Sequence, residues 1–272
     1  MEHLAAIVLA FVLGAVVASF LNVVADRVPR GQSIVRPPSH CPDCGHELKA
    51  VELIPVLSYL LLRGKCRVCA ARIPARVPIV ELIGGLLFAF AIWRYGFTLD
   101  GALAALFFGA LLLIAVIDLE HKLVLNVVLL AALPLAVLST LGWSPDVRLP
   151  VLQIDGWYLS LLADSLLAGG AGFAVFLALA VFSRGGVGAG DVKLAGVLGI
   201  WLGLRVLPVA LMLAVVLGGV VAALLLVSRA SGRKDAIPFA PFLCAGAAAG
   251  LVWGEAIGNW YLDLVTGPLP GI

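Results

Sequence analysis

Two aspartates at the edges of apolar segments are the residues of this sequence best suited to chemistry. Asp118 follows the apolar run Leu99–Ile117, and Asp191 lies in Gly188-Ala-Gly-Asp191 after another such run. Charged side chains at membrane depth are costly and are usually functional. When two carboxylates share one proton, one activates a water while the protonated partner polarises a peptide carbonyl. The pair therefore predicts an aspartyl hydrolase.

Taken singly, each aspartate also has a structural interpretation. Asp118 can be a helix-end carboxylate paired with Lys122, and Asp191 can cap the N-terminus of the next helix. Two features favour catalysis instead. The predicted topology places both aspartates at the same membrane depth. In addition, Gly188 and Gly190 are expected to allow unusual backbone angles and the close approach of an extended substrate.

Three other carboxylates lie in or near apolar runs. Asp164 and Glu255 are expected to make polar contacts between helices. Glu81 is expected near the cytosolic surface, either as a structural residue or in contact with a cofactor.

Four cysteines form two Cys-x-x-Cys pairs, Cys41/Cys44 and Cys66/Cys69, separated by 21 residues. Four thiolates suit tetrahedral Zn²⁺, and a closed four-cysteine site is structural because it leaves no position for water. The alternatives are two disulfides or unrelated thiols. A reducing cytosolic side disfavours the disulfides. The segment is basic but lacks interleaved aromatic residues, so nucleic-acid binding is not expected.

The elements that must position these residues are membrane helices. Of the 272 residues, 62% are hydrophobic and 12% are charged, against about 25% charged in soluble domains. The sequence therefore predicts an all-α polytopic membrane protein. Eight spans are expected, and whether the sixth crosses fully is left open: Leu4–Val24, Pro78–Trp93, Leu99–Ile117, Leu123–Leu141, Leu159–Phe182, Leu194–Leu204, Val206–Val227 and Phe239–Leu262.

The composition divides the chain into a first helix (1–24), a cysteine-containing domain (25–77) and a helical domain (78–272). Residues 25–77 hold nine Lys/Arg and four Asp/Glu. If this domain is cytosolic, fifteen of the 18 basic residues fall on the inner side and both termini are periplasmic, as the positive-inside rule requires. The inner residues outside 25–77 are then Lys122, Arg184, Lys193, Arg229, Arg233 and Lys234, and the outer ones are Arg94, Arg148 and Arg205.

Several motifs together resemble the bacterial type IV prepilin peptidases, which are GxGD-type aspartyl proteases of the inner membrane. The resemblance covers nearly the whole chain. It rests on Ser19-Phe-Leu-Asn22, Pro37-Pro-Ser-His-Cys-Pro-Asp-Cys-Gly45, Ile54-Pro-Val-Leu-Ser58, Arg63-Gly-Lys-Cys66, Ile117-Asp118, Gly188-Ala-Gly-Asp191-Val-Lys-Leu194 and Ile237-Pro-Phe-Ala-Pro-Phe242.

The resemblance implies cleavage of the basic leader of type IV prepilins and pseudopilins after a glycine, at the cytosolic face of the bilayer. It implies catalysis by Asp118 and Asp191 and structural zinc on the four paired cysteines. It also implies methylation of the new amino terminus with S-adenosylmethionine, but it does not identify the residues that bind this donor. Two departures from the family pattern are Ala70, where Gly is usual, and Leu125, where Pro is frequent.

Two other functions compete with this interpretation. A transporter could use the same aspartates as ion sites, although such proteins usually contain inverted repeats, and none is visible here. A non-enzymatic assembly platform could use the basic domain to hold partners. A function that survives loss of both carboxylates would favour the platform.

Overall fold

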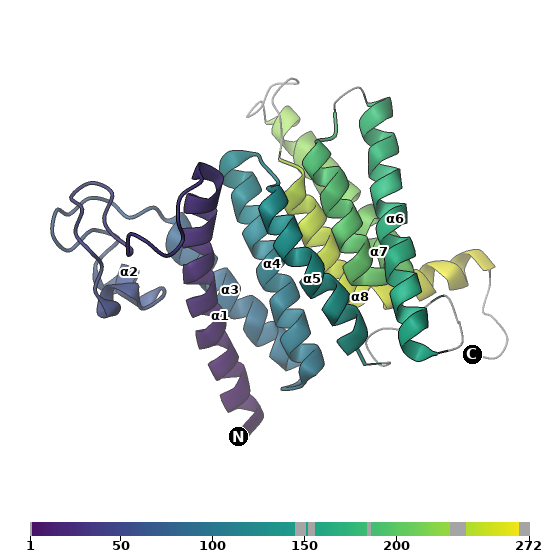
Figure 1. Ribbon diagram of the computed structural model, residues 1–272, viewed down its shortest axis with the longest axis horizontal. Coiled ribbons are helices and arrows are strands. Elements are labelled where there is room, and N and C mark those ends of the chain that lie inside the picture. Colours follow the sequence, from purple (N-terminus) through teal and green to yellow (C-terminus); the bar gives the residue numbers. More distant parts are fainter. Residues whose placement is uncertain (1, 145–150, 152–155, 184–185, 229–237, 267–272) are drawn as a thin grey trace. The chain divides into compact units, whose positions relative to one another are not determined.

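A computed structural model describes residues 2–144, 151, 156–183, 186–228 and 238–266. The described residues are helical, and their only β pairing consists of two isolated bridges, His40 with Glu47 and Lys65 with Arg72. The predicted all-α class is therefore confirmed. The long helices of Figure 1 are α1 (Glu2–Arg27), α3 (Arg76–Tyr95), α4 (Leu99–His121), α5 (Asn126–Gly142), α6 (Trp157–Phe182), α7 (Ala189–Val227) and α8 (Ala240–Thr266).

The apolar segments of the sequence form these helices. Six of the described helices are long and apolar enough to cross a membrane, and α5 is a shorter apolar helix. Each predicted span overlaps one of them. The predicted fourth span began at Leu123, whereas α5 begins at Asn126 after an extended Leu125 with φ −78° and ψ 130°. This φ is one that proline also adopts, so Leu125 keeps the backbone that the family's proline would have.

Helix α7 contains both the sixth and the seventh predicted spans. Its 39 residues are interrupted at Gly203, whose φ of 77° and ψ of 172° are not helical. A Cβ at Gly172 of α6 would lie 2.6 Å from the Ala195 carbonyl oxygen and 3.3 Å from Leu207 Cδ2. Because residues on both sides of the break meet the same point of α6, the chain folds back at Gly203.

Asp164 stabilises this break. Its Oδ2 accepts a hydrogen bond of 3.1 Å from the N–H of Leu204, directly after Gly203, and its Oδ1 accepts one from the N–H of Val151. A broken helix leaves amides without intrahelical partners. The buried carboxylate satisfies one of them, which confirms the predicted role of Asp164 as a contact between helices.

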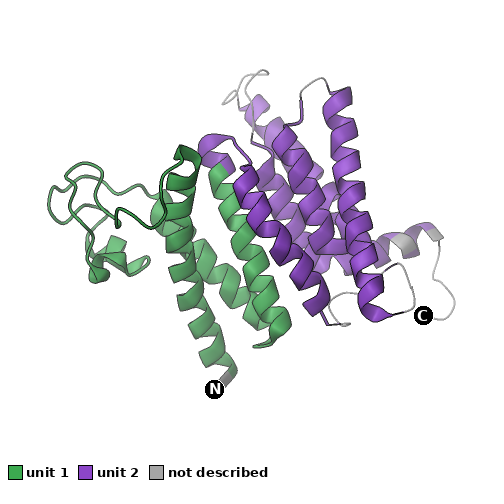
Figure 2. Cartoon of the chain, in the orientation of Figure 1, with its two compact units in different colours: residues 1–117 green, residues 118–272 purple. Residues whose placement is uncertain are grey.

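The chain divides into two compact units, residues 1–117 and 118–272, with the boundary inside α4 (Figure 2). In the first unit α1 packs on α3 through small residues: a Cβ at Gly14 would lie 2.6 Å from Phe88 Cβ, and one at Gly85 would lie 2.8 Å from Phe11. In the second unit a Cβ at Gly250 of α8 would lie 2.8 Å from Ala210 Cβ. Small residues at helix contacts are the usual basis of close packing in membranes.

Some residues used in the sequence analysis lie outside the described part of the chain. They are Arg148, Arg184, Arg229, Arg233, Lys234 and Ile237.

Candidate active site and metal centre

The fold brings Asp118 and Asp191 together within the second unit. Asp118 lies in the last turn of α4 and is 5% exposed, whereas Asp191 is the third residue of α7 and half-buried. The two carboxylates are close enough for their charges to interact. The fold thus brings near each other two carboxylates that are 73 residues apart in sequence.

The N-terminus of α8 contacts this pair. The N–H of Ala240, the first residue of α8, donates a hydrogen bond of 3.1 Å to Oδ2 of Asp118. The first N–H groups of a helix have no intrahelical acceptor, so the bond satisfies Ala240 and orients the carboxylate. Buried Cys244, one turn further along α8, lies within the field of both aspartates. The sequence indicated only a small core residue at Cys244 and gave no sign of the Ala240 hydrogen bond.

The glycines before Asp191 pack against this chain itself. A Cβ at Gly190 would lie 2.7 Å from Cβ of Val124, in the connection between α4 and α5. A Cβ at Gly188 would lie 3.3 Å from Oδ2 of Asp191. Gly188 has an ordinary extended backbone (φ −69°, ψ 144°) and Gly190 is helical. The expectation of unusual backbone angles was wrong, and the space at Gly190 is filled by Val124 rather than left for a substrate.

Lys193 completes the contact between α7 and the connection that joins α4 to α5. Its Nζ donates a hydrogen bond of 2.9 Å to Oδ1 of Asn126, the first residue of α5. The connection leaves α4 through Lys122, whose φ is 53°. Gly190 and Lys193 therefore hold the segment that follows Asp118 against the turn that carries Asp191. The sequence marked Lys193 only as part of a motif, because its partner lies 67 residues away.

The other carboxylates occupy different places. Glu255 of α8 lies 3.7 Å from Arg205 of α7, which confirms its predicted role as a contact between helices. Glu81 is buried in α3, and its Oε2 accepts a hydrogen bond of 2.7 Å from the N–H of Val56. Its contact is thus with this chain's own backbone.

The four paired cysteines converge in the first unit. Their sulfur atoms all lie within 4.8 Å of one another, with 3.7 Å between Cys41 and Cys69 and 4.0 Å between Cys44 and Cys66. These distances are far too long for disulfides. Zn–S bonds of about 2.3 Å in a tetrahedron place sulfurs roughly 3.8 Å apart, so the four cysteines fit zinc.

Each cysteine pair sits on an equivalent turn. The N–H of Gly45 bonds to the Cys41 carbonyl at 2.9 Å, and the N–H of Ala70 bonds to the Cys66 carbonyl at 3.0 Å. Both residues are left-handed, with φ of 71° at Gly45 and 59° at Ala70. Backbone N–H groups of Cys69 and Val68 lower the pKa of the Cys66 thiol to about 6, whereas a hydrogen bond with Cys44 and burial raise the pKa of the Cys69 thiol to about 12.

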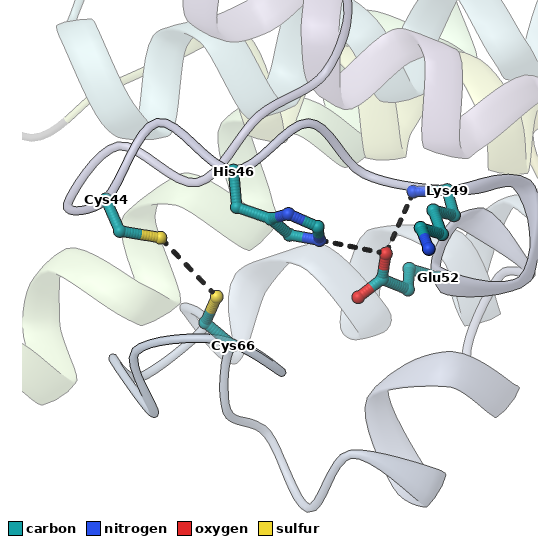
Figure 3. Close-up of polar contacts among 5 residues, drawn as sticks. All are labelled: Cys44, His46, Lys49, Glu52 and Cys66. Carbon is teal, nitrogen blue, oxygen red and sulfur yellow. Dashed lines mark hydrogen bonds and ion pairs between the residues drawn. The ribbon is translucent and has the colours of Figure 1, made fainter.

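A buried carboxylate supports the first turn (Figure 3). Oε2 of Glu52 lies 3.2 Å from Nε2 of His46 and accepts a 2.9 Å hydrogen bond from the N–H of Lys49. The Lys49 N–H, followed by the His46 imidazole, lowers the pKa of Glu52. Because the His46 carbonyl accepts the N–H of Cys41, Glu52 steadies the backbone of one of the four clustered cysteines. The sequence gave no signal for this residue.

Comparison with known proteins identifies relatives over the whole chain. Residues 12–95 match the bacterial peptidase A24 N-terminal domain, and residues 105–223 match the type IV leader peptidase family. A prepilin leader peptidase/N-methyltransferase of Bacillus subtilis is 33% identical over 257 residues, covering 94% of this chain and 98% of the relative. One from Pseudomonas aeruginosa is 33% identical, with 97% of each chain covered. One from Myxococcus xanthus is 40% identical over 83% of this chain and 65% of the relative. No solved structure matches.

Proposed function

The chain belongs to the type IV leader peptidase family, and on that premise we propose that it is a membrane-embedded aspartyl endopeptidase that removes the basic leader of type IV prepilins and pseudopilins after a glycine. The relatives named above are prepilin leader peptidase/N-methyltransferases. The observation that carries the assignment to residues is the pairing of Asp118 with Asp191 at adjoining helix ends.

The reaction follows from two carboxylates that hold one proton between them. The ionised member takes a proton from a water, which attacks the scissile carbonyl, while the protonated member hydrogen-bonds to the carbonyl oxygen. The pair then returns a proton to the leaving amine. The N–H of Ala240 keeps the Asp118 carboxylate in a single orientation throughout, and the pair titrates as a unit.

The substrate helix lies in the bilayer with its scissile bond at the interface. The bond must be extended there, because a helical peptide keeps its carbonyl in an intrahelical hydrogen bond. The glycine before the cut disfavours helix and so helps to expose the bond. The leader, being basic, meets anionic lipid and local carboxylates such as Glu120 rather than the basic residues 25–77.

Residues 25–77 form a zinc-stabilised domain on the cytosolic side of the inner membrane. The distribution of Lys and Arg supports this orientation, which leaves both termini in the periplasm. Cys41, Cys44, Cys66 and Cys69 would hold the ion. A closed four-sulfur site supplies folding free energy and no open coordination position, so zinc takes no part in cleavage.

The enzyme also methylates the new amino terminus. S-adenosylmethionine, when bound, supplies the methyl group, and the terminal amine that cleavage releases accepts it with loss of a proton. The names of the relatives support this second activity. Cleavage must come first, because the amine does not exist in the intact precursor.

Purified protein in lipid, incubated with a model prepilin with and without S-adenosylmethionine, tests both activities. Mass spectrometry should find the leader peptide in both reactions, and a mature product heavier by one methyl group only with the donor. If the mature product carries no added methyl group even with the donor present, the function is restricted to cleavage. An intact precursor refutes the proposed peptidase and leaves the transporter and platform interpretations.

A further inference from the structure

Unit 1 carries an exposed apolar surface outside its membrane helices. It lies on η2 (Ala50–Leu53) and α2 (Leu57–Leu61). We call it the apolar face, and it consists of Val51, Leu53, Ile54, Leu57, Leu60 and Leu61. Leu60 and Leu61 are 64% and 72% exposed. Six exposed large apolar side chains in a twelve-residue stretch are unusual for a surface in water, so this stretch is a candidate contact surface.

A hydrogen bond ties the start of α2 to α3. The N–H of Val56, the residue before α2, donates to Oε2 of Glu81 at 2.7 Å. Glu81 lies five residues beyond Arg76, where α3 begins, and helical side chains lean toward the N-terminus of their helix. The bond therefore holds the start of α2 beside the first turns of α3, and Figure 1 shows α2 beside α1 rather than beyond its end.

Val56 has a backbone conformation that needs such support. Its φ of 61° and ψ of −47°, with the N–H of Leu57 bonded to the Pro55 carbonyl at 2.6 Å, define a γ-turn of the strained type. A β-branched residue with positive φ persists only where its surroundings over-determine it. The buried Glu81 carboxylate supplies that constraint. The hydrogen bond between Val56 and Glu81 thus fixes the direction in which α2 presents its leucines.

Polar contacts join α1 and α3 at the end of the helix pair from which residues 28–75 emerge. Arg76 pairs with Asp26 at 2.8 Å, and Nδ2 of Asn22 donates to the Val77 carbonyl at 3.2 Å. Just beyond, α3, an apolar helix long enough to cross a membrane, exposes Ile79 by 53%. The bond from Val56 to Glu81, one turn past Val77, attaches the apolar face to this same end of α3.

Basic side chains flank the apolar face. Lys49 precedes η2, and Arg63 and Lys65 follow α2, all of them exposed. Apolar side chains flanked by Lys and Arg, at a depth of about 5–10 Å, are the pattern of segments that lie in the plane of a membrane interface. Basic residues near the surface attract anionic lipid headgroups.

We propose that η2 and α2 form an interfacial anchor that inserts its apolar face between the headgroups and acyl chains of the adjacent leaflet. Lys49, Arg63 and Lys65 lie among anionic headgroups. The anchor holds the four-cysteine domain against the bilayer, and it does not depend on which reaction the carboxylates perform.

Photo-crosslinking of the full chain in nanodiscs of phosphatidylethanolamine and phosphatidylglycerol tests the anchor. Leu61 is replaced by p-benzoylphenylalanine, and the matched variant carries the same group at the exposed Glu47 of the same domain. After irradiation, intact-mass analysis should find lipid adducts at position 61 at several times the level at position 47. Equal levels at both positions, or adducts of position 61 with this chain or an added prepilin, would overturn the anchor.

A second measurement uses the unaltered protein, so the proposal stays testable if the variants fold poorly. A hydrophobic carbene reagent dissolved in the lipid should label peptide 50–62 several-fold more than peptide 39–49. Equal labelling of the two peptides would exclude insertion. Replacing phosphatidylglycerol by phosphatidylcholine should lower the adduct yield at position 61. An unchanged yield would show that the basic residues do not hold the anchor through anionic headgroups.

Discussion

Nζ of Lys193 donates a hydrogen bond of 2.9 Å to Oδ1 of Asn126, joining the first turn of α7 to the first residue of α5. The bond ties the connection that follows Asp118 to the first turn of α7, which carries Asp191. We therefore expect it to help position the two carboxylates. Lys193→Met removes the donor without a large change in volume. We expect cleavage to fall by roughly tenfold to a hundredfold, because small misplacements of catalytic groups are costly.

The matched variant is Asn126→Asp, which keeps an oxygen acceptor for the lysine. Its cleavage rate, measured on the same model prepilin, should stay within a few-fold of the wild-type rate. If Lys193→Met cleaves at the wild-type rate, the bond does not position the aspartates.

Gly190 offers a second test of the same contact. A methyl group there would lie 2.7 Å from Cβ of Val124, whereas one at Gly170 of α6 would meet nothing within 4 Å. Gly190→Ala must push the connection away from α7 and should lower cleavage at least tenfold. Gly170→Ala should be active, and its thermal unfolding temperature should be unchanged or higher. Equal activity of the two variants would contradict the tight contact.

Metal analysis tests the four-sulfur site. Purified protein should contain one zinc per chain, and Cys66→Ser should lose most of it because a hydroxyl is a poor zinc ligand. Cys244→Ser is the matched variant, since Cys244 is buried far along the sequence from the cluster, and it should keep its zinc. Well-folded wild-type protein without zinc would disprove the metal site.

The two cysteine turns differ, among other positions, at the left-handed residue that follows the second cysteine, Gly45 in one turn and Ala70 in the other. Exchanging glycine and alanine there should change the stability of the domain in opposite directions. Ala70 adopts φ 59° where Gly45 adopts φ 71°, and a left-handed conformation costs a residue with a Cβ about 1–2 kcal/mol. Ala70→Gly should stabilise the domain by about 1 kcal/mol, and Gly45→Ala should destabilise it by a similar amount. The midpoint of zinc loss during chelator titration measures both. A shift in the same direction for both variants would show that backbone strain does not control the turns.

The sequence predicted the helices and the chemistry well, for physical reasons. Long apolar runs form membrane helices, because buried backbone must be satisfied internally, so every predicted span overlaps a helix. Two Cys-x-x-Cys pairs bring four sulfurs together through local turns. Alternating the spans across one bilayer predicted Asp118 and Asp191 at the same membrane depth, and in the structure their charges are close enough to interact.

Contacts between distant residues could not be predicted in the same way. Ala240 bonds to Asp118 through a backbone N–H, and backbone groups carry no sequence signal. Gly190 was expected to make room for a substrate, but Val124 fills that space. A glycine in a sequence indicates that another group lies close to its backbone, but it does not identify that group. The buried Glu52 and Glu81 likewise accept backbone amides that no side-chain pattern identifies.

The most direct test of the account is the rate of prepilin cleavage by Asp118→Asn and Asp191→Asn. An amide cannot act as the base, and members of a catalytic unit fail together, so each variant should lose activity by at least about a thousandfold while still inserting in the membrane. Glu255→Gln, which removes a carboxylate paired with Arg205, should cleave at nearly the wild-type rate. Cleavage within about tenfold of wild type by either aspartate variant would contradict the assignment of Asp118 and Asp191 as the catalytic pair.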